Sequence, residues 1–86
     1  MMNDKNKIIV YSKNNCPRCL FSKRFLDKHG IEYKDINISY DEDALKYVKS
    51  LGVKQTPYIE SPIGNWSGLN TKKLNELNEE MNGREN

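Results

Sequence analysis

The chain has 86 residues, of which 36% are hydrophobic and 30% charged, and this size and balance fit one compact domain over residues 1–86. The formal net charge of +2 is too small to indicate binding to nucleic acid, and the apolar run that begins at Ile8 is too short for a signal peptide or a membrane span. We therefore expect a cytoplasmic monomer without a membrane partner, with frayed ends at about 1–6 and 82–86.

The first predicted elements are a strand and a helix with a short polar loop between them. The β-branched and aromatic residues at 8–11 are typical of a buried strand. Pro17 suits the first turn of a helix, because its missing N–H would have no partner there. Leu20, Phe21 and Phe25 follow at helical spacing and are expected to form the apolar face of a helix that ends at Gly30.

The next predicted pair is a strand over Glu32 to Ile38 and a second helix. Ser39 with Glu42 three residues later forms a capping-box pattern, which places the helix start at Ser39. Gly52 can end this helix. Its apolar face is expected to contain Ala44, Leu45, Val48 and Leu51.

The last third predicts a hairpin and a helix. Short strands at Tyr58 to Glu60 and Asn65 to Ser67 flank a turn, and an amphipathic helix with Leu74, Leu77 and Met81 follows. The element order is then β-α-β-α-β-β-α. It predicts an α/β thioredoxin-like fold, with a four-stranded mixed sheet flanked by three helices.

Only two cysteines occur, Cys16 and Cys19, and a pair this close does not suit a disulfide-stapled secreted scaffold. At a helix N-terminus, the free N–H groups and the helix dipole stabilise a thiolate on Cys16, whereas Cys19 lies one turn further in. We expect Cys16 to attack a disulfide and Cys19 to resolve the mixed disulfide. Pro17 and Arg18, which lie between the cysteines, are expected to influence the redox potential of the pair.

A zinc site and a redox-sensing or zinc-stabilised binding module are the alternatives from another class. Zinc usually takes four protein ligands, and His29 is the only further strong ligand beside the two cysteines. His29 also suits a helix C-terminus, next to Gly30, better than it suits catalysis. No metal is therefore expected.

The positive charges are concentrated in the half that carries the cysteines. Residues 1–34 contain eight Lys or Arg and three Asp or Glu, whereas residues 35–86 contain six and nine. Lys13, Arg18, Lys23 and Arg24 either form an ordinary solvated surface, or favour the thiolate and attract an acidic partner.

Several segments together resemble the glutaredoxin-like NrdH-redoxins over about residues 7 to 80. These are Tyr11-Ser12-Lys13, Cys16-Pro17-Arg18-Cys19, Gly30-Ile31-Glu32-Tyr33, Gln55-Thr56-Pro57 and Trp66-Ser67-Gly68. On residue statistics alone Pro57 would be an ordinary trans strand start. The resemblance implies a cis Pro57 that faces the dithiol, with backbone groups of Thr56 exposed to pair with an extended substrate.

The resemblance also implies a function and partners. NrdH-redoxins receive electrons from NADPH through thioredoxin reductase, bind no cofactor of their own, and supply a ribonucleotide reductase. The main alternative is a glutaredoxin that uses glutathione. The glutathione clamp of glutaredoxins is not matched by Gly64-Asn65-Trp66-Ser67-Gly68-Leu69, although Leu69, Asn70 and Thr71 also depart from the NrdH pattern.

Individual roles remain open for two of these residues. Trp66 either packs in the core or closes the surface around the dithiol, and Lys13 either is a solvated loop residue or places a positive charge near the thiolate. The residues expected to bind substrate are Lys13, Pro17, Arg18, Thr56, Pro57, Trp66, Ser67 and Gly68.

Overall fold

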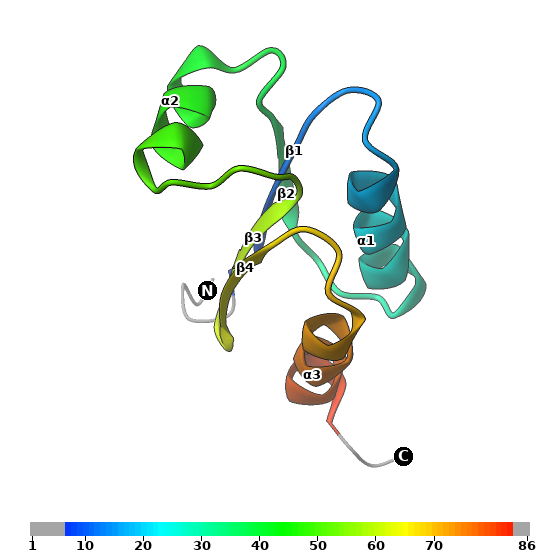
Figure 1. Ribbon diagram of the computed structural model, residues 1–86. Helices are drawn as coiled ribbons and strands as arrows, with labels where there is room; N and C mark the ends of the chain where they lie inside the picture. The colour runs from blue at the N-terminus through cyan, green and yellow to red at the C-terminus, as the bar shows by residue number, and fades with distance from the viewer. Residues whose placement is uncertain (1–6, 84–86) are drawn as a thin grey trace.

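A computed structural model of the chain describes residues 7–83 (Figure 1). Its elements follow the predicted order: β1 (Ile9–Ser12), α1 (Pro17–Lys28), β2 (Lys34–Asn37), α2 (Glu42–Ser50), β3 (Tyr58–Ser61), β4 (Gly64–Ser67) and α3 (Thr71–Asn82). The fraying expected at 1–6 and 84–86 lies outside the described residues. Helix α3 continues through Asn82, which had been expected to belong to the frayed end.

The four strands form one mixed sheet in the order β2-β1-β3-β4. Strand β1 pairs in parallel with β2, with Val10 opposite Asp35, and antiparallel with β3, with Val10 opposite Ile59. Strand β4 then pairs antiparallel with β3. The predicted thioredoxin-like plan is confirmed, and the central strand β1 runs directly into the loop that carries Cys16.

Successive side chains of β1 point to opposite faces of the sheet, and helices cover both faces. Val10 belongs to a buried cluster with residues of α1 and α3, and Tyr11 belongs to a second cluster with residues of α2. Figure 1 shows α2 apart from α1 and α3, across the strands. The larger cluster consists of Ile8, Val10, Leu26, Ile31, Ile59, Trp66, Leu74 and Leu77.

The predicted apolar face of α1 is wrong at two of its three residues. Leu20 and Phe21 are 48% and 49% exposed, and only Phe25 packs partly against the core. The buried face instead carries Cys19, Ser22 and Leu26, at i, i+3 and i+7. Two of these side chains are small and not aliphatic, so the hydrophobic pattern did not mark them.

The predicted N-cap of α2 is also wrong. Asp41, not Ser39, precedes the helix, and its Oδ1 accepts a hydrogen bond from the Ala44 N–H at 3.0 Å. Asp caps a helix as well as Ser does, and it lies one residue before the first turn. Ser39 is used elsewhere, since its Oγ accepts a hydrogen bond from the backbone N–H of Asn14 at 3.1 Å.

The predicted end of α1 is confirmed. His29 is the C-cap, Gly30 follows with a φ of 67°, and the Ile31 N–H donates to the Leu26 carbonyl at 2.9 Å. A positive φ of this size favours glycine, which has no Cβ.

Candidate active site

Cys16 is the N-cap of α1, and Pro17 is its first helical residue, as the sequence predicted. The backbone of Cys16 is extended, and its Sγ accepts a hydrogen bond from the Cys19 N–H at 3.1 Å. Cys16 and Cys19 form a disulfide. A sulfur in the N-cap position lies at the positive end of the helix dipole, where free N–H groups stabilise negative charge.

The two sulfur-bearing residues differ in exposure. Cys16 is partly exposed, whereas Cys19 is only 2% exposed and belongs to the buried face of α1. Another protein therefore reaches Cys16 first. Cys19 is placed to attack Cys16 Sγ once that sulfur is bonded to a target.

The Thr56–Pro57 segment lies against Cys16. The peptide bond between the two residues is cis, as the resemblance implied, and both residues are buried. Thr56 Oγ1 is 3.3 Å from Cys16 Sγ. Since a disulfide sulfur carries no proton, the hydroxyl is the donor in this contact. The sequence pattern pointed only to the backbone of Thr56, because its side-chain contact depends on the fold that brings residues 16 and 56 together.

The Trp66-Ser67-Gly68 segment is hydrogen-bonded to the cis-Pro segment through Gly68. The Gly68 N–H donates to the Pro57 carbonyl at 2.7 Å. Gly68 has a φ of 80°, and a Cβ there would lie 2.9 Å from the Gln55 side chain. Any residue other than glycine would therefore displace Gln55.

Trp66 lies in the core with 7% of its surface exposed, as its core-packing alternative proposed. Its Nε1 has no hydrogen-bond partner within residues 7–83. Ser67 is half-buried and stands opposite Tyr58 in the β3–β4 pair. Neither side chain has a recorded contact with the dithiol, so a direct role of these two residues in substrate binding stays a prediction.

Two clefts flank the dithiol. Both contain Lys13, Asn15, Cys16 and Pro17. The first also contains Asn14, Cys19, Leu20, Lys23 and Asn37. The second also contains Arg18, Lys54, Gln55 and Thr56. The fold thus brings the predicted residues Lys13, Pro17, Arg18 and Thr56 to one place. It adds Lys54, which no sequence pattern had marked.

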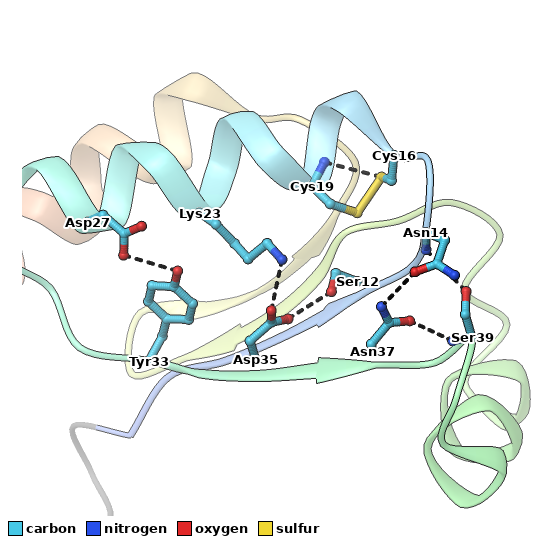
Figure 2. Close-up of polar contacts among 10 residues, drawn as sticks. All are labelled: Ser12, Asn14, Cys16, Cys19, Lys23, Asp27, Tyr33, Asp35, Asn37 and Ser39. Carbon is cyan, nitrogen blue, oxygen red and sulfur yellow. Dashed lines mark hydrogen bonds and ion pairs between the residues drawn. A yellow bond between two sulfur atoms is a disulfide. The ribbon is translucent and has the colours of Figure 1, made fainter.

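A polar chain links α1 to the sheet next to Cys19 (Figure 2). The Lys23 ammonium is paired with Asp35 Oδ2 at 2.8 Å, and the buried Ser12 hydroxyl donates to Asp35 Oδ1 at 2.7 Å. Lys23 is four residues after Cys19 and lines the same cleft. Its charge is therefore largely balanced by Asp35.

The loop before Cys16 is tied to the segment after β2 through Asn14. Besides its backbone bond to Ser39, Asn14 donates from Nδ2 to the Tyr40 hydroxyl at 2.9 Å. It also accepts at Oδ1 from Asn37 Nδ2 at 3.0 Å, and Figure 2 shows the Asn14, Asn37 and Ser39 side chains together. These bonds fix the direction from which the chain enters α1.

His29 lies at the opposite end of α1 from Cys16, with its ring centroid 4.4 Å from that of Phe25. In the described part of the chain, no three His, Cys, Asp or Glu side chains come together in a way that could hold a metal ion. None of the helices between residues 7 and 83 has the length and apolar character needed to cross a membrane.

Comparisons with known proteins agree with this geometry. The Glutaredoxin family model matches residues 8–61. The glutaredoxin-like protein NrdH of Salmonella typhimurium is 30% identical over 70 residues, which cover 81% of this chain and 86% of that protein. The NrdH protein of Lactococcus lactis subsp. cremoris is 33% identical over 70 residues, which cover 81% of this chain and 97% of that protein. The structure of Escherichia coli NrdH-redoxin superposes with a TM-score of 0.78 at 27% sequence identity. The superposition covers 83% of this chain and 93% of that protein.

Proposed function

Because the chain belongs to the NrdH-type proteins of the glutaredoxin family, and is thus a thiol-disulfide oxidoreductase, we propose that it carries electrons from thioredoxin reductase to a ribonucleotide reductase. The observation that carries the proposal is the unequal exposure of the two cysteines at the start of α1, with Thr56 against the outer one. This is the arrangement that a protein-disulfide reductant needs.

The reaction starts from the reduced dithiol. The Cys16 thiolate attacks one sulfur of the target disulfide, a Cys16–target disulfide forms, and the other target sulfur leaves as a thiolate. Cys19, after losing its proton, then attacks Cys16 Sγ. The bond to the target breaks, and the target leaves fully reduced. The Cys16–Cys19 disulfide of the structure is the oxidised product of this step.

Two electrons and two protons must then return to the dithiol. We propose that they come from NADPH through the flavin of thioredoxin reductase, so that the chain itself binds no cofactor. The relative from Escherichia coli is described as having a thioredoxin-like activity profile, which favours this reductase over glutathione. A cytoplasmic location fits a carrier that must be kept reduced.

A direct test supplies the chain with each reductant in turn and follows NADPH oxidation with a disulfide-bearing protein as acceptor. One reaction contains thioredoxin reductase, and the other contains glutathione and glutathione reductase. We expect turnover with thioredoxin reductase. Turnover with the glutathione system alone would refute the proposal and assign the chain to the glutathione-dependent glutaredoxins.

The target is tested separately. A ribonucleotide reductase that is turned over without any other reductant should resume synthesis of deoxyribonucleotides when the reduced chain is added in stoichiometric amounts. A reductase that stays inactive, while the same preparation recovers with dithiothreitol, would remove this target from the proposal.

A further inference from the structure

The cleft beside Cys16 that contains Thr56 carries an unusual concentration of positive charge. Lys13, Arg18 and Lys54 line it, together with Cys16 itself. The three cations come from the loop before α1, the first turn of α1 and the segment before Pro57, so only the folded chain assembles them. All three side chains are exposed.

Within residues 7–83 these charges have no counterion. Among residues 7–83, neither an ion pair nor a side-chain hydrogen bond involves Lys13, Arg18 or Lys54, and the described lining of both clefts includes no Asp or Glu. Lys23, on the other flank of the dithiol, differs because Asp35 pairs with it at 2.8 Å. The cleft with Thr56 therefore carries more unpaired positive charge than the cleft with Lys23, which shares only Lys13 of the three.

Acidic side chains gather in another part of the molecule. A hollow along β2 and the start of α2 is lined by Asp35, Asp41, Glu42 and Asp43 together with Lys34, and it shares Asn37 with the cleft that contains Lys23. None of these carboxylates lines the cleft of Lys13, Arg18 and Lys54, which contains the reactive sulfur. In a solution of physiological ionic strength the Debye length is about 8 Å, so this charge acts mainly on groups that come close to Cys16.

We propose that the cleft of Lys13, Arg18 and Lys54 selects target disulfides in which the reactive cysteine is flanked by acidic residues. The inference rests on the proposed function and specifies its substrate class. When the Cys16 thiolate attacks such a disulfide, one or more carboxylates next to the target cysteine reach the three cations. A target with basic flanks is repelled by the same groups.

The test uses the reduced full-length chain and no reductase. Two peptides of identical length are prepared as symmetric disulfide-linked dimers, one with Asp on both sides of its only cysteine and one with Asn. Each reaction converts one dimer and one Cys16–Cys19 dithiol into two peptide thiols and one protein disulfide. Because the dimers are symmetric, attack at either sulfur is the same chemistry.

We expect the Asp peptide to be reduced about tenfold faster than the Asn peptide at low salt. This advantage should largely disappear in about 1 M salt, where the Debye length falls to about 3 Å. Lys54→Gln should slow the Asp peptide about threefold and leave the Asn peptide unchanged. Lys28→Gln, in the last turn of α1 and outside both clefts, is the matched control and should change neither rate.

A second measurement separates charge recognition from an effect on the sulfur. The rate at which uncharged iodoacetamide alkylates Cys16 is measured over a range of pH for the unmodified chain and for Lys54→Gln. Equal alkylation profiles support recognition of the peptide. If Lys54→Gln slows alkylation and both peptides by the same factor, Lys54 acts through the thiolate and the inference is overturned.

The remaining outcomes are equally distinct. Equal rates for the two peptides would overturn the inference and leave the proposed function standing. If neither peptide dimer is reduced by the dithiol, the proposed function fails together with the inference.

Discussion

The two sides of helix α1 differ both in exposure and in the residues that they carry. The inner side carries Cys19, Ser22 and Leu26, and all three residues are buried. The outer side carries Leu20 and Phe21, two large apolar residues that are half exposed. Burial along α1 thus follows the side of the helix that faces the core and not the apolar character of the side chain, since Cys19 and Ser22 are buried whereas Leu20 and Phe21 are half exposed.

The largest effects are expected when each of the two sulfurs is replaced by oxygen in turn. Cys16→Ser removes the sulfur that a target can reach, so we expect complete loss of disulfide reduction. Cys19→Ser removes the buried sulfur and leaves the first step intact, so the chain should accumulate as a mixed disulfide with its target. Non-reducing electrophoresis and mass spectrometry of the products distinguish the two. Retained turnover by Cys16→Ser would contradict the assignment of the outer sulfur as the attacking group.

The next effect concerns stability. Leu26→Ala opens a cavity in the core beneath α1, and we expect it to lower the free energy of unfolding by about 2–5 kcal/mol. Leu20→Ala, on the outer side, should change it by no more than about 0.5 kcal/mol. Urea unfolding of the oxidised proteins measures both. Equal losses for the two variants would show that Leu20 is buried in solution.

Ser22 provides a finer test of the inner side. Its hydroxyl is fully buried and has no hydrogen-bond partner within the described chain. Ser22→Ala removes a polar group that is buried without compensation, and we expect the free energy of unfolding to stay unchanged or to rise by up to about 1 kcal/mol.

Ser12→Ala is the matched control, because that buried hydroxyl does donate a hydrogen bond, to Asp35 at 2.7 Å. It should lower the free energy of unfolding by about 1 kcal/mol. A comparable loss for Ser22→Ala would mean that the Ser22 hydroxyl has a partner in solution.

The smallest expected effect is a change in the pKa of a tyrosine near the C-terminal end of α1. Burial, and a hydrogen bond from its hydroxyl to Asp27 at 3.0 Å, raise the pKa of Tyr33 from 10.0 to about 12. The folded chain holds this proton more tightly than the unfolded chain does. The associated stability is therefore fully present below pH 10 and is lost as the pH rises through about 12.

Asp27→Asn removes the charged partner, so the pKa of Tyr33 should fall part of the way toward 10.0, with the contribution of burial retained. Tyrosinate absorbance in the near ultraviolet, followed against pH, reports the change. An unaltered titration would show that Asp27 does not raise the pKa of Tyr33.

The sequence predicted the features that depend on local chemistry. Pro17 after Cys16 placed the sulfur at a helix start, and Gly30 marked the helix end, because each residue has a backbone preference that does not depend on the rest of the fold. The order of elements followed in the same way. The cis form of Pro57 came from the family resemblance, since the residue itself favours trans.

Other features depend on contacts between distant segments and left no local pattern. The buried face of α1 was missed because a cysteine and a serine fill positions where a hydrophobic repeat was expected. Asp41 and Ser39 were both suitable caps, and the choice between them follows from the bond that Ser39 makes to Asn14. Lys54 joined the candidate site only because the cis-Pro segment lies against Cys16.

The bonds of Asn14 have a consequence for how fast a partner can engage. Ser39, Tyr40 and Asn37 hold this residue from three directions, so the entropy of ordering the loop is lost during folding and not at each encounter. Docking of a target then requires little rearrangement of the backbone around Cys16. We expect the backbone amide of Asn14 to exchange its hydrogen slowly in both the oxidised and the reduced chain. Reduction of the disulfide would then change the two sulfurs and leave the backbone around Cys16 in the same ordered conformation.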